Sequence, residues 1–133
     1  MAKSLKVLIA EDDDSIARLY QTYLEAYDIA VERANDGNEA LEKIQSFKPD
    51  VLLLDIMMPG KDGFDVLKEL SDNNNKLPVI IFTALSSEDE KKRALDYGVK
   101  AYFVKSQVIM SDVLDKINEI VPQSKAKLIA ILA

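Results

Sequence analysis

Residues 51–60 read VLLLDIMMPG, and this stretch decides the fold class. Four aliphatic residues on consecutive positions are typical of a strand covered on both faces, as in a parallel sheet. The run ends at Asp55 and is followed by the turn residues Pro59 and Gly60. The stretch therefore predicts a buried parallel strand with a carboxylate at its carboxyl end.

The same pattern recurs along the chain. Further apolar runs begin near residues 6, 29, 79 and 101, and segments of helical period separate them. Strands that alternate with helices at this spacing indicate right-handed βαβ crossovers. We therefore expect an α/β fold: a doubly wound (βα)5 domain with a five-stranded parallel sheet, over residues 1–122. Residues 123–133 are expected to form a short C-terminal tail or linker stub.

The fourth helical segment, residues 87–97, differs from the others because it is only weakly amphipathic. Its apolar residues are Ala94, Leu95 and Tyr97, so we expect the most loosely packed helix here. Ser87 with Glu90 predicts a capping box at its start.

Composition excludes several classes of function. The 133 residues contain no Cys and no His, which removes disulfides, thiolate nucleophiles and imidazole bases or ligands. The net charge of −6 disfavours direct binding to nucleic acid. No signal peptide is visible and no apolar stretch approaches a membrane span, so we expect a cytoplasmic domain without membrane contact.

Polar residues follow four of the predicted strands. Glu11, Asp12 and Asp13 follow the first strand, Thr83 closes the fourth and Lys105 closes the fifth. Carboxyl ends of parallel strands share one edge of the sheet, so these side chains and Asp55 are expected to meet there. Carboxylates, a hydroxyl and an ammonium together suit a divalent cation and a phosphoryl group.

The acids after the first strand favour a magnesium site. Two carboxylates ~4 Å apart repel by about 4 kcal/mol at an intermediate dielectric, and a cation removes that repulsion. Asp12 and Asp55 are the expected direct Mg²⁺ ligands, with Glu11 or Asp13 acting through water. An acidic helix N-terminus that needs no metal is an equally good interpretation of Glu11 to Asp13 alone.

Asp55 is a candidate nucleophile because a carboxylate can form an aspartyl phosphate. Thr83 could donate to a phosphoryl oxygen, and Lys105 could pair with Asp55 or its phosphoryl group. Each residue also has a plain interpretation: a turn Asp, a β-branched residue at a strand end, a solvated lysine. Tyr102 on the fifth strand is, from the residues alone, a packing residue at least as readily as a functional one.

Taken together, these motifs resemble the receiver domain of two-component response regulators. The matching stretches are VLIAEDD (7–13), LDIMMPGKDG (54–63), VIIFTA (79–84) and YFVK (102–105), within a likeness that covers about residues 5–121. The resemblance implies a flavodoxin-like fold with strand order 2-1-3-4-5. It also implies a signalling switch that promotes its own phosphorylation and dephosphorylation, and not an enzyme.

The resemblance also assigns roles to the residues at the strand ends. Asp55 would be the phosphoacceptor, and Mg²⁺ would be held by Asp12, Asp55 and the backbone carbonyl of Met57, with Glu11 acting through water. Lys105 would pair with the phosphoryl group. Thr83 would be the switch hydroxyl, and Tyr102 the aromatic residue that turns inward with it.

Partners follow from the same resemblance. The phosphoryl donor would be a phosphohistidine on a histidine kinase or histidine phosphotransfer protein, which fits a chain without His. Ile16 and Leu19 match docking positions for such partners. The face built from the fourth helix, fifth strand and fifth helix would act on a downstream protein target or an output domain. The chain would be a monomer or a phosphorylation-dependent dimer.

Two departures from the family pattern lead to further expectations. Ser106 stands where members usually have Pro, and a cis bond there would cost roughly 2.5–4 kcal/mol, so we expect an altered loop after Lys105. Met57 and Leu85 offer no polar side chain to orient a hydrolytic water. We therefore hypothesise slow self-dephosphorylation.

Three other functions compete with this interpretation. A pseudo-receiver, switched by protein contact without phosphorylation, is the serious rival, although such proteins usually lose the acids or the lysine. A phosphatase of the haloacid-dehalogenase kind needs a second Asp two residues after Asp55, where Met57 stands. A flavodoxin-like flavin carrier is disfavoured because the acids from Glu11 to Asp14 would repel a phosphate.

Overall fold

The computed structural model of the chain describes residues 4–121, so the predicted tail at 123–133 lies outside the described residues. Within the described part, strands and helices alternate from end to end. The elements are β1 (Lys6–Ala10), α1 (Asp14–Glu25), β2 (Ala30–Ala34), α2 (Gly37–Phe47), β3 (Val51–Leu54), α3 (Gly63–Asp72), β4 (Val79–Thr83), α4 (Glu88–Asp96), β5 (Ala101–Val104) and α5 (Met110–Ile120).

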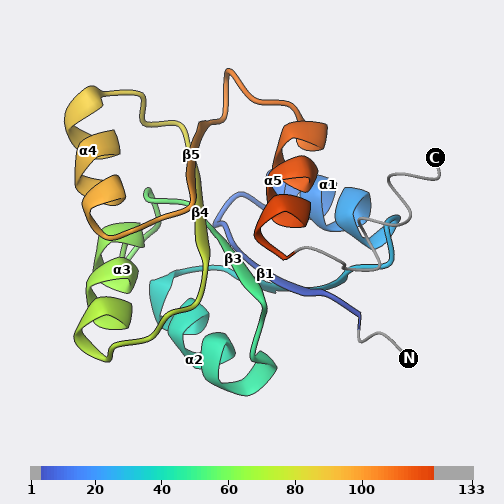
Figure 1. The fold of residues 1–133 in the computed structure, drawn as a ribbon, viewed down its shortest axis with the longest axis horizontal. Coiled ribbons are helices and arrows are strands. Elements are labelled where there is room, and N and C mark those ends of the chain that lie inside the picture. Colours follow the sequence, from blue (N-terminus) through green and yellow to red (C-terminus); the bar gives the residue numbers. More distant parts are fainter. Residues whose placement is uncertain (1–3, 122–133) are drawn as a thin grey trace.

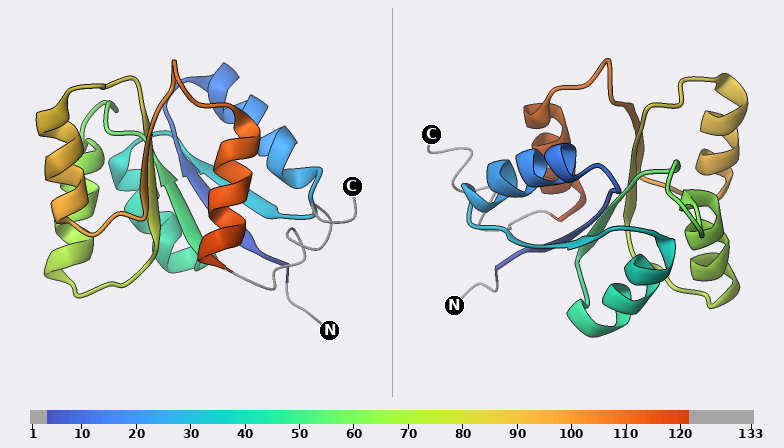
Figure 2. Two further views of the ribbon diagram at one scale, coloured as in Figure 1. Left: turned by 45° about the horizontal axis from the view of Figure 1, so that its top comes forward. Right: turned by 180° about the vertical axis from the view of Figure 1, so that it is seen from behind.

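The strands form one sheet of order β2-β1-β3-β4-β5, and every neighbouring pair is parallel (Figure 1). This arrangement confirms the predicted (βα)5 fold of flavodoxin-like type. Helices cover both faces, with α1 and α5 on one and α2, α3 and α4 on the other (Figures 1 and 2). The β3 sequence is buried along its whole length, as its aliphatic run predicts.

Alternate residues of the central strands supply two separate cores. Leu52 and Leu54 of β3 pack in the cluster beneath α2, α3 and α4, whereas Val51 and Leu53 pack in the cluster beneath α1 and α5. Because successive side chains of a strand point to opposite faces, a strand inside such a sheet needs apolar residues at every position.

The register aligns the carboxyl ends of the strands. Ala10, the last residue of β1, pairs with Leu54, the last residue of β3. The ladder continues one step further, since the Asp55 amide donates to the Ala10 carbonyl over 3.0 Å. At the other side of the sheet the Lys105 amide donates to the Thr83 carbonyl over 2.8 Å. The polar residues that follow the strands are therefore delivered to one edge.

Side-chain caps fix where several helices begin. Asp62 and Asp65 form a reciprocal capping box at the start of α3, which the sequence analysis did not identify. At α4 the predicted box forms only in part. The Ser87 hydroxyl accepts from the Glu90 amide as expected, but the Glu90 carboxylate bonds that hydroxyl instead of the Ser87 amide. A hydroxyl can do both because it is donor and acceptor at once.

The fourth helix is sparsely packed, as its composition predicts. Ala94 is its buried residue, while Leu95 is 46% exposed. The Arg93 guanidinium lies 3.9 Å from the centre of the Phe64 ring and supplies a lateral contact to α3. Of the residues described, no helix is both long and apolar enough to span a membrane.

Replacing Gly63 by Ala is expected to destabilise the fold. A Cβ at Gly63 would lie 2.6 Å from the Asp55 carbonyl oxygen and 2.6 Å from Ile56 Cα, which are backbone atoms with little room to move. We expect Gly63→Ala to lower the free energy of unfolding by about 1–3 kcal/mol in urea titrations, as overpacking usually does. The control is Ser71→Ala, an exposed change in the same helix, which should stay within about 0.5 kcal/mol of wild type. Equal stabilities of the two variants would contradict this prediction.

Candidate functional site

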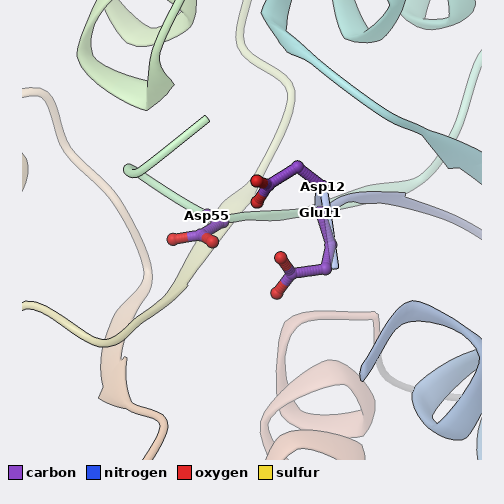
Figure 3. A group of neighbouring side chains, drawn as sticks. All are labelled: Glu11, Asp12 and Asp55. Atoms are coloured by element: carbon purple, nitrogen blue, oxygen red, sulfur yellow. The ribbon is translucent and has the colours of Figure 1, made fainter. Parts of the chain in front are cut away.

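Three carboxylates meet at the carboxyl edge of the sheet. Glu11, Asp12 and Asp55 each offer one oxygen, and these oxygens lie within 4.8 Å of one another (Figure 3). Glu11 and Asp55 are 1% and 3% exposed, whereas Asp12 is open to solvent. The site therefore has two buried acids and one accessible acid.

Asp13 is separate from this cluster. It is the N-cap of α1, and its Oδ1 accepts from the Ile16 amide over 3.0 Å. Its own amide donates to Glu11 Oε2 over 3.1 Å. The helix-cap interpretation of the acidic run thus holds for Asp13, and the cluster interpretation holds for Glu11 and Asp12.

Lys105 supplies the positive charge of the site. Its Nζ lies 2.9 Å from Asp55 Oδ2 and forms a second ion pair with Glu11 Oε1. The ammonium also lies 5.3 Å from the centre of the Phe82 ring. The lysine side chain is 18% exposed, so these interactions form in a partly desolvated environment. One ammonium thus faces two buried carboxylates.

The electrostatics of the site reflect this imbalance. Burial raises the pKa of Glu11, and the nearby charge of Asp55 raises it further, although Lys105 and the Asp13 amide act in the opposite direction. For Lys105, burial lowers the pKa, but its interactions with Glu11 and Asp55 outweigh burial and the pKa is raised. The pKa of Lys105 therefore stays above its ordinary value, and burial makes the charged form of Glu11 less favourable than in solvent.

Asp55 is oriented by the chain that follows it. Its Oδ1 accepts from the Met57 amide over 3.1 Å, while Oδ2 faces Lys105. Each carboxylate oxygen thus has one donor and keeps a further lone pair. The Met57 side chain is 54% exposed beside this loop.

Thr83 and Tyr102 converge on the backbone of one residue. Thr83 is fully buried, and its Oγ1 accepts from the Leu85 amide over 3.4 Å. The Tyr102 hydroxyl donates to the Leu85 carbonyl over 2.9 Å. Burial raises the pKa of Tyr102, with smaller contributions from Glu90 and Asp55. Tyr102 is therefore more than a packing residue, since it binds the β4–α4 loop.

The two predicted docking residues differ in accessibility. Ile16 is half-buried against the cluster beneath α1 and α5. Leu19 is 53% exposed and lines a shallow hollow on α1 with Arg18 and Thr22. Of the two, Leu19 is the side chain that a partner could bury more fully.

The loop after Lys105 contains a trans peptide at Lys105–Ser106, since no cis bond occurs in residues 4–121. The Gln107 amide donates to the Val104 carbonyl over 2.9 Å, so the chain turns directly after β5. Lys105 lies inside this turn.

Sequence reasoning missed two residues that contact the site. Phe82 lies under the Lys105 ammonium, and Arg33 of β2 donates to the Glu11 carbonyl through Nε at 3.0 Å and Nη2 at 2.9 Å. Arg33 lies one residue before the end of β2, so the strand-end argument applied to β2 could have indicated it.

The donor set fits a hard divalent cation. The exposed Asp12 carboxylate has no hydrogen bond or ion pair with any residue in the described range. Among those residues, the buried Glu11 Oε1 has an ion pair but no hydrogen bond of regular geometry. Unused carboxylate lone pairs, one of them buried, are the ligands that Mg²⁺ accepts directly or through water.

The raised pKa of Glu11 predicts a pH dependence in metal-free protein. A group whose pKa is raised in the folded state makes stability fall as pH rises from its ordinary value of 4.5 through the raised one. Compared with wild type, Glu11→Gln should remove this contribution, worth at most about 1.4 kcal/mol per pH unit. Urea titrations in chelator at several pH values measure it. Parallel stability curves for the two proteins would contradict the assignment.

Comparison with known proteins identifies the family. Residues 7–118 match the family model described as the response regulator receiver domain. The response regulator MprA of Mycobacterium ulcerans is 38% identical over 102 residues, covering 77% of this chain and 44% of that protein. The alkaline phosphatase synthesis transcriptional regulatory protein PhoP of Bacillus subtilis is 38% identical over 100 residues, covering 75% of the chain and 42% of that protein. The chain thus spans less than half the length of these relatives.

Solved structures agree with the sequence comparison. The receiver domain of the Francisella response regulator 1452 superimposes with a TM-score of 0.83 at 37% identity, covering 88% of this chain and 96% of that one. The BeF3-activated N-terminal receiver domain of Klebsiella pneumoniae RstA gives 0.82 at 31% identity, covering 89% and 99%. The fold, the acid cluster and these likenesses lead to one conclusion: the chain belongs to the family of response regulator receiver domains of two-component signalling.

Proposed function

We propose that this domain accepts a phosphoryl group on Asp55 from a phosphohistidine of a partner protein, in a reaction that depends on Mg²⁺. The observation that carries the proposal is the setting of Asp55, a buried carboxylate that pairs with the Lys105 ammonium and belongs to one cluster with the acids Glu11 and Asp12. A buried carboxylate is costly unless hydrogen bonds or opposite charges compensate it. Here one ammonium is shared by two buried acids, which leaves room for a further positive charge.

The expected metal ligands come from the resemblance to receiver domains, and the unused carboxylate lone pairs of the cluster support them. We assign Mg²⁺ to Asp12, Asp55 and the backbone carbonyl of Met57, with Glu11 acting through a bound water. When bound, the cation supplies positive charge that offsets both the acids and an incoming phosphoryl group. The chain's own contribution is to hold the carboxylates on adjacent strand ends before the metal arrives.

The chemistry is an in-line displacement at phosphorus. An oxygen of Asp55 attacks the phosphorus atom, the O–P bond forms, and the N–P bond of the phosphohistidine breaks. The imidazole leaves with the electron pair of that bond and takes up a proton. Lys105 and Thr83 are proposed to stabilise the phosphoryl oxygens, Lys105 by its charge and Thr83 by its hydroxyl. These interactions favour transfer by positioning and charge.

Switching is proposed to run through Leu85. If the Thr83 hydroxyl moves to bond the phosphoryl group, its hydrogen bond from the Leu85 amide is lost. The β4–α4 loop, whose Leu85 carbonyl accepts from the Tyr102 hydroxyl, is then free to rearrange. The sparse packing of α4 lowers the resistance to such a change. The face formed by α4, β5 and α5 would then present a new surface to its target.

The remaining assignments complete the proposal. Residues 1–122 would form the receiver domain and 123–133 a tail or linker. The donor would be a histidine kinase or a histidine phosphotransfer protein that docks near Ile16 and Leu19. The output would be a downstream protein or a further domain, with no nucleic acid bound by this chain itself. A cytoplasmic location, and a monomer or a phosphorylation-dependent dimer, stay predictions.

Phosphorylation at Asp55 can be tested directly by intact mass. After incubation with Mg²⁺ and acetyl phosphate, wild type should gain one phosphoryl group, because Asp55 can displace acetate from that donor. Asp55→Asn should gain none, and chelator should abolish the gain in wild type.

The matched control is Asp50→Asn, since Asp50 lies at the opposite end of β3 and accepts from the Lys6 amide. It should phosphorylate like wild type. A folded wild-type protein that gains no mass and does not bind beryllofluoride would instead be a pseudo-receiver, switched by protein contact without phosphorylation.

The phosphorylated state is expected to decay slowly. Met57 and Leu85 give no polar side chain to orient an attacking water, so Met57→Asn, which adds an amide, should shorten the half-life several-fold. Met57→Leu serves as the control and should decay like wild type. The fraction of phosphorylated protein is followed by intact mass after the donor is removed. Rapid decay of the wild-type adduct would refute the hypothesis.

A further inference from the structure

The guanidinium of Arg33 binds both ends of the acidic loop that joins β1 to α1. Nε and Nη2 donate to the Glu11 carbonyl at 3.0 and 2.9 Å, and Nη1 lies 2.5 Å from Asp14 Oδ1. The Arg33 side chain is 21% exposed, so most of it is removed from solvent. No role in the proposed phosphoryl transfer requires this residue.

These bonds extend the sheet beyond its last backbone pair. The β1–β2 register ends at Ala10 and Ala34, and the Glu11 amide still donates to the Ala34 carbonyl over 3.0 Å. The next ladder bond would have to reach the Glu11 carbonyl, but β2 has ended by then. The Arg33 guanidinium supplies the missing donors and occupies both lone pairs of that carbonyl.

The bonded carbonyl belongs to the peptide that joins Glu11 to Asp12. Its oxygen is held by the Arg33 guanidinium, and the peptide before it is held by the bond from the Glu11 amide to the Ala34 carbonyl. The two side chains that flank this peptide are members of the carboxylate cluster (Figure 3). A rotation of this peptide would turn the Asp12 carboxylate away from Asp55.

We propose that Arg33 is a positioning residue for the divalent-cation site, which orients Asp12 and Glu11 through the peptide between them. This inference rests on the proposed function, since it concerns the Mg²⁺ site assigned there. Groups that orient metal ligands typically contribute 10–100-fold to metal affinity. Arg33 acts through the backbone, so about tenfold is expected.

Charge and positioning have opposite effects on affinity, which makes the inference testable. A positive charge near the site repels Mg²⁺, so losing it alone would tighten binding. Loss of the fork would weaken binding. Arg33→Lys keeps the charge but replaces the planar fork by a single ammonium, and Arg33→Met removes both.

The experiment is calorimetric titration of metal-free, unphosphorylated protein with MgCl₂. Arg33→Lys and Arg33→Met are both expected to raise the dissociation constant about tenfold. The control is Lys43→Met. Lys43 donates to the Arg33 carbonyl, so this substitution removes a positive charge near the same strand end without changing a residue that bonds Glu11. It should bind within twofold of wild type. Urea unfolding verifies that each variant is folded, and Arg33→Lys decides the test if Arg33→Met is not.

The outcomes separate this inference from the function on which it rests. Three results would overturn the role of Arg33 without affecting the proposed metal site. They are wild-type affinity in folded Arg33→Lys, tighter binding in Arg33→Met, and a loss of affinity in Lys43→Met equal to that in the Arg33 variants. A folded wild type that does not bind Mg²⁺ would overturn the proposed metal site together with this inference. Faster amide hydrogen exchange at Asp13 in Arg33→Lys, with global stability unchanged, would support positioning.

Discussion

The shared ion pair of Lys105 with Asp55 and Glu11 links the ends of three strands. In the order β2-β1-β3-β4-β5, Lys105 follows β5 and reaches across the end of β4 to the acids that follow β3 and β1. Buried charges are tolerated only with partners, and here the partners come from strands far apart in the sequence. The edge of the sheet is therefore held together by the same charged groups that form the candidate site.

The charges of this arrangement do not balance, since one ammonium faces a cluster of three carboxylates. Glu11 is buried with a raised pKa, and Asp12 adds a third carboxylate within reach of the same point. In the metal-free protein these acids repel one another, and Lys105 offsets only part of the repulsion. A site with excess negative charge binds a divalent cation more favourably than an electrically neutral site would. Because its carboxylates repel one another, other residues are needed to keep them in place. The Arg33 guanidinium bonds the Glu11 carbonyl and the Met57 amide bonds Asp55, and we propose that these bonds restrain the site.

The same edge is joined to a surface that can respond. Thr83 is buried at the carboxyl end of β4, and Tyr102 lies on the edge strand β5, yet both bond to the backbone of Leu85. The loop that contains Leu85 leads into α4, whose one buried residue in the described chain is Ala94. A change at Asp55, the proposed phosphoacceptor, thus has a short path to a sparsely packed helix.

The sequence by itself determined the fold class and most of the site residues. Consecutive aliphatic residues in β3 require burial on two faces, and parallel strands must end at a common edge, so Glu11, Asp12, Asp55, Thr83 and Lys105 could be placed together from the pattern. Local rules could not separate Asp13, which caps α1, from its acidic neighbours. They also predicted a full capping box at Ser87, where the Glu90 carboxylate bonds the hydroxyl and not the amide. Only the tertiary structure decided that Arg33 donates to the Glu11 carbonyl and that Lys105 forms ion pairs with two acids. These contacts depend on the register between strands and on the direction of long side chains, which no periodicity in the chain encodes.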